Sequence, residues 1–271
     1  MRTELANGSR GIDSNALASS IVLVCRKRPA DAPTTTLRDF INALKRELKP
    51  ALQKLQASNI APVDLAQSAI GPGMGVYSRY SKVLEADGTP MSVRSALQII
   101  NQELDLYFTE QDGELDRDSR FCVDLYTQNA FNDMKFGEAD VLARAKNTSV
   151  EKLAGCGVLY AQKGIVRLQT REEIPEKTNN EMIWLLTQQL TRAMEKDGVM
   201  ETAKIISDIL TSEPEQAKAL AYRLFTIAER KGWAQEAYAY NSLVIAWPDV
   251  QAKAAEMQSQ RKNAKQMTLF E

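Results

Sequence analysis

The sequence contains no histidine in its 271 residues. This absence excludes a Ser-His-Asp triad, a Cys-His catalytic pair and any metal site that depends on imidazole ligands. Cysteine is also scarce: Cys25, Cys122 and Cys156 are far apart and form no CxxC pair, so a zinc ribbon is not expected. An odd number of dispersed cysteines is typical of a reducing compartment, and we therefore expect a cytoplasmic protein without a metal.

The net charge is close to zero, and long apolar runs are few. The 34 Lys and Arg residues nearly balance the 35 Asp and Glu residues, so any nucleic-acid-binding surface has to be a local patch. The longest apolar run near the N-terminus, residues 18–25, is too short to cross a bilayer, and the polar residues before it do not read as a signal peptide. We therefore expect a soluble protein with no membrane partner.

The run at residues 18–25 is unbroken and rich in β-formers, which is typical of a strand buried on both faces. No partner strand follows nearby, which indicates that the rest of its sheet lies outside this chain. The run ends at three cations, Arg26, Lys27 and Arg28. These cations either contact a DNA backbone or a cofactor, or form a solvated strand end.

A different pattern occupies residues 136–176. A short helix is expected at residues 137–145, a capping box at residues 148–151 opens a second one, and Lys163-Gly164 joins two strands as a β-hairpin. Helix, turn, helix and hairpin is the order found in the second half of a winged helix-turn-helix. In that motif the start of the second helix reaches base edges, and flanking cations hold phosphates. The candidate DNA contacts are Arg144, Lys146, Asn147, Ser149 and Lys152. A winged helix that binds protein or acts as a spacer is the alternative.

Helical periodicity dominates the rest of the chain, with apolar residues at spacings of three and four after Leu37, after Ser92 and from Glu181 onward. A threonine among residues 34–36 can cap the first helix, and Pro50 is expected to kink or divide it. We therefore predict a mainly α fold of packed helical hairpins. Its parts are a residual N-terminal strand, a helical bundle, a winged-helix-like unit and C-terminal helical hairpins, over residues 1–31, 32–135, 136–176 and 177–271 respectively.

A glycine-rich segment, Gly-Pro-Gly-Met-Gly at residues 71–75, is similar to a loop that cradles a phosphate or the carboxylate of S-adenosylmethionine. Such a loop has to follow a strand and open a helix, whereas the residues before this segment are expected to be helical. We interpret it as a turn between two helices, the second of which spans residues 76–85. The neighbouring Tyr77-Ser-Arg-Tyr80 either stacks on a base and holds a phosphate through Arg79, or packs in the core.

Several motifs, in order along almost the whole chain, resemble the C-terminal region of a family of large bacterial and archaeal adenine-specific DNA methyltransferases. They include NALASSIVLVCRKRP at residues 15–29, NIAPVDLAQ at 59–67, IGPGM at 70–74, AKNTS at 145–149 and ERKGW at 229–233. Members of that family carry an upstream Rossmann-like domain. That domain holds a glycine-rich S-adenosylmethionine loop and an Asp/Asn-Pro-Pro-aromatic motif, which grips the flipped adenine. Neither motif is present here, and the chain has no Pro-Pro pair.

The resemblance implies that residues 1–31 hold the last strand of the methyltransferase sheet, and that S-adenosylmethionine belongs to the complete enzyme and not to this chain. No catalytic or cofactor-binding residue is expected here, so the chain alone would be inactive. Its expected partners are DNA, a catalytic methyltransferase half and other proteins of phage-defence gene clusters, in which some relatives lie. From the residues alone, a stand-alone helical protein-interaction module without a nucleic-acid role remains the alternative function.

Overall fold

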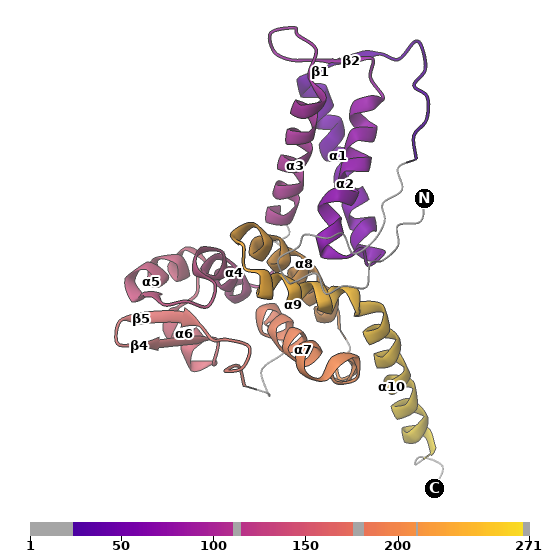
Figure 1. The fold of residues 1–271 in the computed structure, drawn as a ribbon. Helices are drawn as coiled ribbons and strands as arrows, with labels where there is room; N and C mark the ends of the chain where they lie inside the picture. The colour runs from indigo at the N-terminus through magenta and orange to yellow at the C-terminus, as the bar shows by residue number, and fades with distance from the viewer. Residues whose placement is uncertain (1–23, 111–114, 176–181, 210, 268–271) are drawn as a thin grey trace, which may run out of the picture.

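The computed structural model describes residues 24–110, 115–175, 182–209 and 211–267. It is 68% helical, which confirms the expected mainly α class. The helices of the described residues are α1 (Leu37–Ala57), α2 (Pro62–Ser78), α3 (Val93–Glu110), α4 (Arg117–Asn129), α5 (Phe136–Ala145), α6 (Val150–Gly155), α7 (Ile183–Ser207), α8 (Glu213–Lys231), α9 (Ala234–Ile245) and α10 (Trp247–Met267). The strands are β1 (Thr34–Thr36), β2 (Lys82–Leu84), β3 (Met134–Lys135), β4 (Leu159–Gln162) and β5 (Ile165–Leu168). Helices α7 to α9 lie between an α1–α3 bundle and a unit built from α4 to α6 (Figure 1).

The α1–α3 bundle forms because each of its helices has an apolar stripe. On α1 the stripe is fully buried and includes Phe40, Leu44 and Leu52. Thr36 caps the helix as expected, since its hydroxyl accepts a hydrogen bond from the Asp39 amide at 3.2 Å. Pro50 does not divide α1, which continues through it to Ala57.

The glycine-rich segment at residues 71–75 is not a turn, because α2 passes through it without a break. Gly73 is required for packing: a Cβ at this position would lie 2.7 Å from a side-chain carbon of Ile100 on α3. The segment therefore allows two helices to approach closely and is not a loop between a strand and a helix, which an anion-cradling segment of this kind has to be. The prediction of a helix over residues 76–85 is also wrong, since α2 ends at Ser78 and β2 follows.

A short parallel pair, β1 with β2, closes one end of the bundle, and sequence reasoning did not foresee it. Most of the strand expected at residues 18–25 lies outside the described residues. Its last two residues, Val24 and Cys25, are exposed and belong to no strand, so the strand does not extend to Cys25 as expected.

Helices α4, α5 and α6 form one unit with a three-stranded antiparallel sheet of order β3-β5-β4. The predicted hairpin is confirmed: Leu159 pairs with Leu168, and Lys163 and Gly164 at its turn have φ values of 53° and 76°. The chain order α4-β3-α5-α6-β4-β5 with this sheet order is that of a complete winged helix-turn-helix. The sequence revealed only its second half, because β3 spans two residues and α4 has the pattern of an ordinary amphipathic helix.

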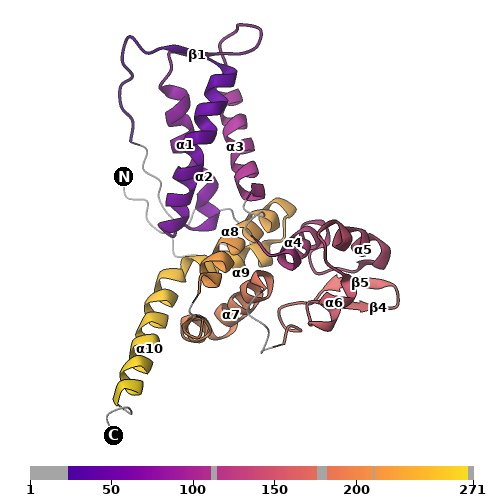
Figure 2. The same ribbon diagram turned by 180° about the vertical axis from the view of Figure 1, so that it is seen from behind.

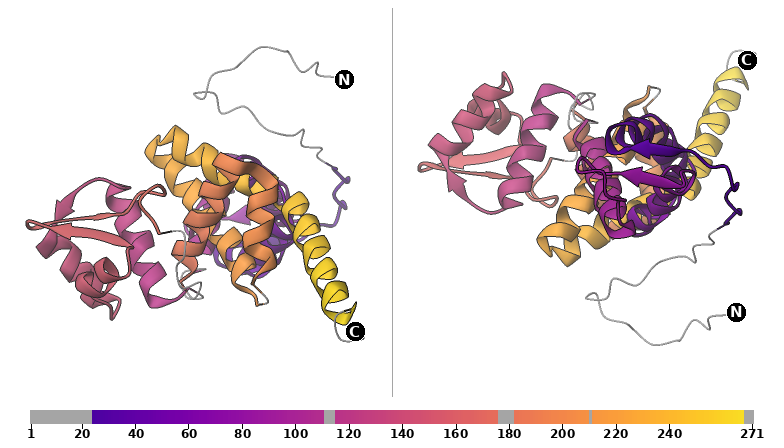
Figure 3. Two further views of the ribbon diagram at one scale, coloured as in Figure 1. Left: turned by 90° about the horizontal axis from the view of Figure 1, so that it is seen from below. Right: turned by 90° about the horizontal axis from the view of Figure 1, so that it is seen from above.

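The C-terminal helices form hairpins, as expected. Gly232, with a left-handed φ of 73°, ends α8 and begins the turn into α9. Helix α7 is broken at Gly198, where φ is 72° and ψ is −156°. Seen from behind, α10 packs on this layer and then projects away from it (Figure 2). Views from below and above show the winged-helix unit on one side of the molecule and residues 24–33 on the opposite side (Figure 3).

Candidate nucleic-acid interface

The second helix of the winged-helix unit, α6, starts with polar side chains that are already engaged. Ser149 is its N-cap and accepts a hydrogen bond from the Lys152 amide at 3.2 Å, so the helix starts one residue later than the expected capping box. Thr148 donates instead to Asp118 Oδ1 on α4, at 2.5 Å. Asn147 has a left-handed φ of 56°, which a turn residue of this type tolerates. The side chains that were expected to contact base edges therefore stabilise the turn and the start of α6.

The three cations predicted around α6 lie on the winged-helix unit, and each pairs with a carboxylate of the same unit. Lys152 lies 2.6 Å from Asp118, Lys146 lies 3.0 Å from Asp124, and Arg144 lies 2.6 Å from Asp140. Side-chain exposure is 58% for Lys152 and 79% for Arg144. These are surface ion pairs, and such pairs contribute only about 0–1 kcal/mol each.

Asp118 connects the first helix of the unit to the second. Partial burial acts to raise the pKa of its carboxyl group, but the hydrogen bonds from Lys152 and Thr148 outweigh that effect and leave the pKa lowered. Asp118 is therefore ionised at neutral pH and holds the start of α6 against α4. It also competes with any external anion for the ammonium group of Lys152.

The β4–β5 hairpin adds a cation that the sequence analysis did not include. Lys163 is exposed at the tip of this wing, where winged helices commonly reach a neighbouring groove. The sequence predicted a hairpin turn at this position, and this turn was the signal that could have identified Lys163 as a candidate contact. Behind the tip, Arg167 stacks on Tyr160 at 4.9 Å and forms a two-pronged pair with Glu173 at 2.6 and 2.7 Å. Arg167 therefore stiffens the base of the wing.

The remaining predicted cations lie in the segment before β1, at residues 26–28, and at the end of α2, away from the winged-helix unit (Figure 1). Arg26 and Lys27 are exposed. Arg28 donates to the carbonyl oxygen of Tyr80 at 2.7 Å and so fastens the N-terminal segment to the end of α2. Arg79 forms a two-pronged pair with Glu47 at 2.6 and 2.9 Å. The structure therefore does not join these residues to the group around α6.

The tyrosine pair beside Arg79 belongs to the core. Tyr77 donates to the carbonyl oxygen of Met91 at 2.8 Å, and its ring meets Phe40 edge-on at 5.8 Å. Tyr80 packs against the same core. Of the two interpretations, packing is therefore the one that the structure supports.

A buried network attaches the winged-helix unit to the C-terminal helices. The Arg171 guanidinium donates to Glu236 of α9 at 2.5 Å and to Gln188 of α7 at 3.1 Å. It also lies over the Tyr240 ring, 4.9 Å from the ring centre. Because only 10% of the Arg171 side chain is exposed, this pair is an internal anchor and does not form part of an open binding surface.

Helix α7 begins against the same unit, where its first backbone amides donate to side-chain oxygens at the start of α4. Asp116 accepts from the Ile183 amide at 3.2 Å, and Ser119 accepts from the Trp184 amide at 2.8 Å. These side chains cap α7 from elsewhere in the chain, because Met182 provides no side-chain cap. The winged-helix unit is therefore fixed to the C-terminal helices at two places.

Within the part of the chain that the structure describes, no three or more Cys, Asp or Glu side chains are grouped so that they could hold a metal ion. In the same residues, no helix combines the length and the apolar character needed to cross a bilayer.

The comparisons with known proteins agree with the boundary seen in the structure. Residues 116–269 match the family model described as Domain of unknown function (DUF8807), and the match starts at Asp116, the residue that caps α4. No curated protein and no solved structure matches the chain. Because the matched residues form more than half of the chain, the protein belongs to the DUF8807 family.

Proposed function

We propose that this chain is the non-catalytic, DNA-engaging part of an adenine-specific DNA methyltransferase. The resemblance of its motifs supports the methyltransferase assignment. One structural observation supports the DNA role: a complete winged-helix order carries exposed cations at both the second helix and the wing, Lys152 and Lys163. These are the two elements that contact DNA in proteins with this motif.

The carboxylates beside these lysines do not prevent such contacts. A surface ion pair contributes about 0–1 kcal/mol, so a DNA phosphate can replace Asp118 at Lys152 at little cost. Release of counterions from the DNA adds a favourable, salt-dependent term for each phosphate that is neutralised. The exposed positions of Lys152 and Lys163 make this exchange possible without any change in the fold.

The geometry favours phosphate contacts over base reading. Helix α6 has only six residues, and the side chains of Thr148 and Ser149 are occupied by Asp118 and by the helix cap. Phosphate contacts position a protein on the duplex, while base contacts specify the sequence. We therefore assign the choice of target adenine to the catalytic half, and the holding of DNA to this chain.

The test is the salt dependence of DNA binding by the full chain, measured by fluorescence anisotropy with a labelled duplex. We expect the affinity to fall as salt rises, with a log–log slope that becomes shallower by about 0.9 when Lys163→Ala removes one phosphate contact. Lys204→Ala on α7 is the matched control, because Lys204 is a 60% exposed lysine outside the winged-helix unit. An identical slope for Lys163→Ala and wild type would contradict the proposal.

A second function, a protein-interaction module, is supported by a different observation. Acidic and basic residues are equal in number between residues 116 and 175, so the winged-helix unit has no net charge. A DNA-binding unit is usually basic. Absent or salt-insensitive binding in the experiment above would favour this second function.

A further inference from the structure

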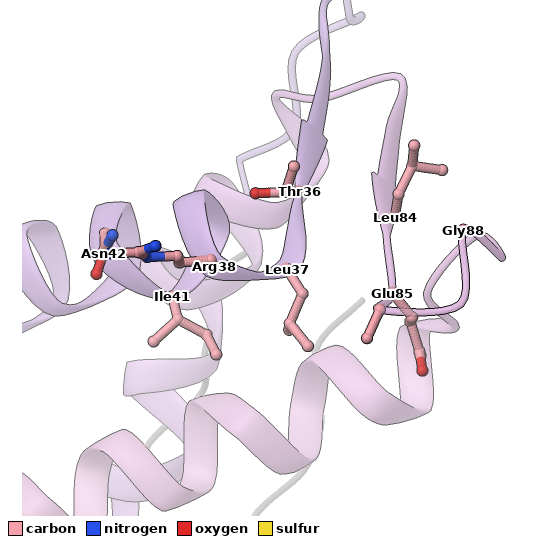
Figure 4. A pocket seen from close by; sticks show the side chains of 9 residues that line it. Thr36, Leu37, Arg38, Ile41, Asn42, Leu84, Glu85 and Gly88 are labelled. Carbon is pink, nitrogen blue, oxygen red and sulfur yellow. The ribbon is translucent and has the colours of Figure 1, made fainter.

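Two apolar places on the surface of the molecule differ in the charges around them. One is a groove of about 600 Å³ beside β1 and β2, where Leu37 and Ile41 project side by side from α1 (Figure 4). Its lining includes both Arg38 and Glu85, so this groove offers charges of both signs. The other place is the tip of the β4–β5 hairpin, where Ile165 is 38% exposed. There the neighbouring strand and turn residues contribute only positive charge, which favours an anionic ligand.

Ile165 lies in a row of side chains across the outer face of the three-stranded sheet, while its neighbour Val166 is buried in the core. Its partner on β3 is Lys135, and its partner on β4 is Gln162. Directly opposed residues of antiparallel strands lie on the same face of a sheet, so these three side chains stand side by side. Lys163 follows Gln162 as the first residue of the turn. We call Lys135, Gln162, Lys163 and Ile165 the wing-tip face, and all four are exposed.

Two carboxylates lie at the other end of the same sheet face, where Arg167 holds them. Arg167 forms its two-pronged pair with Glu173, and Asp133 lies 3.7 Å from the same guanidinium. Among the residues that the structure describes, Lys135 and Lys163 pair with no carboxylate, in contrast to the three cations around α6. The wing-tip face therefore presents two ammonium groups that need not release a partner before they bind an anion.

The side-chain amide of Gln162 is oriented as a hydrogen-bond donor. The Tyr160 hydroxyl donates to the Gln162 Oε1 atom at 3.3 Å, which leaves the NH2 group for an external acceptor. Tyr160 itself lies under the Arg167 guanidinium, 4.9 Å from the ring centre, so this orientation is supported from the base of the wing. The wing-tip face thus combines two cations, an amide donor and an apolar side chain.

We propose that the wing-tip face binds the minor groove of double-stranded DNA, with Ile165 inside the groove and the two lysines on the phosphates at its margins. The inference rests on the proposed DNA role and not on the resemblance to methyltransferases. Lysine, glutamine and isoleucine are among the side chains that minor-groove proteins use. The minor groove is about 6 Å wide, which suits a hairpin closed by a two-residue turn better than it suits a helix.

The chemistry of the face predicts which base pairs it accepts. In the minor groove, A·T and T·A pairs present only the acceptors adenine N3 and thymine O2, which suit the Gln162 amide donor. A G·C pair adds the guanine N2 amino group, a donor that neither Ile165 nor the Gln162 NH2 group can accept. We therefore expect A·T-rich segments to be preferred, without discrimination between A·T and T·A. This preference places the wing on the duplex and leaves the choice of target adenine to the catalytic half.

The test measures binding of the full chain to three duplexes by fluorescence anisotropy. The duplexes differ only in a central segment of A·T, G·C or inosine·cytosine pairs, since inosine lacks the N2 amino group of guanine but keeps its major-groove edge. We expect the A·T and inosine·cytosine duplexes to bind alike, and about fivefold or more tightly than the G·C duplex. Equal affinities for the inosine·cytosine and G·C duplexes would overturn the proposal, because the amino group in the minor groove would then have no effect.

Two variants assign the effect to the wing-tip face. Ile165→Ala should remove most of the preference, whereas Val141→Ala, which truncates a 67% exposed side chain on α5 of the same unit, should keep it. Gln162→Ala should weaken binding to the A·T duplex, and it is the second variant in case Ile165→Ala does not fold, as checked by circular dichroism. An unchanged preference in both folded variants would contradict the proposal.

The salt dependence of the same samples separates this inference from the proposed function. Salt-dependent binding without a preference among the three duplexes would overturn the minor-groove assignment alone. Absence of binding to all three duplexes would overturn the proposed DNA role together with this inference. We also expect Lys135→Ala to make the log–log slope shallower by about 0.9, as one phosphate contact is lost.

Discussion

Two ion pairs on either side of the winged-helix unit show how burial changes what a pair does. Lys152 and Asp118 meet at the surface, where 58% of the lysine side chain is exposed. Arg171 and Glu236 meet between the unit and α9, where only 10% of the arginine side chain is exposed. The first pair can exchange its anion for a phosphate, whereas the second has no such freedom because both charges were taken out of water. One region is therefore suited to binding and the other to anchoring.

The largest expected effect comes from breaking the anchor. Arg171→Ala removes the cation that pairs with the Glu236 carboxylate in a largely buried site, so we expect the free energy of unfolding to fall by about 3–5 kcal/mol. Urea denaturation followed by circular dichroism measures this change. Arg144→Ala is the surface counterpart, since 79% of that side chain is exposed, and we expect a loss below about 1 kcal/mol. Equal losses for the two variants would remove the distinction between anchor and binding surface.

A second comparison separates two glycines of the segment at residues 71–75. Gly73→Ala places a methyl group against Ile100, so we expect α2 and α3 to separate and the protein to lose about 1–3 kcal/mol of stability. Gly75→Ala meets no atom within 4 Å and replaces glycine by a better helix former, so we expect a gain of up to about 1 kcal/mol. Thermal unfolding of both variants provides the measurement. A tolerated Gly73→Ala would mean that the segment is not a packing device.

These glycines also mark the limit of what the sequence predicts. The spacing of apolar residues was sufficient to predict the helices, and Lys163-Gly164 was sufficient to predict the hairpin, because both signals are local in the sequence. The close approach of Gly73 to Ile100 depends on a different helix, and the cap that Asp116 provides to the Ile183 amide joins positions 67 residues apart. Such contacts leave no local pattern.

The candidate site shows the same limit. Its cations could be named from the sequence, because they surround a recognisable capping box. Their carboxylate partners could not be named, because Asp118 precedes Lys152 by 34 residues and belongs to another helix. The β1–β2 pair was not predicted because each strand has only three residues.

The third prediction concerns acid stability at the base of the wing. The hydrogen bonds from Arg167 lower the pKa of Glu173 from 4.5 to about 2. The unfolded chain therefore binds this proton more readily than the fold does, so the stabilisation is complete above pH 4.5 and is lost as the pH falls toward 2. Thermal unfolding as a function of pH should show a steeper loss in this window for wild type than for Glu173→Gln. Parallel curves would contradict the prediction.

The smallest expected effect is an increase in DNA affinity. Asp118→Asn removes the anion that competes for Lys152, so we expect DNA to bind up to about fivefold more tightly, as expected for a surface pair of up to about 1 kcal/mol. Asp133→Asn is the matched control, because it removes a charge from the same unit but its partner is Arg167, 3.7 Å away. An equal gain in both variants would mean that only net charge matters.

Hydrogen–deuterium exchange in the presence of a short DNA duplex tests the central claim most directly. We expect DNA to protect backbone amides at the turn between α5 and α6 and in the β4–β5 hairpin, while exchange in the α1–α3 bundle stays unchanged. Protection that omits the winged-helix unit, or no protection at DNA concentrations that saturate binding, would contradict the account.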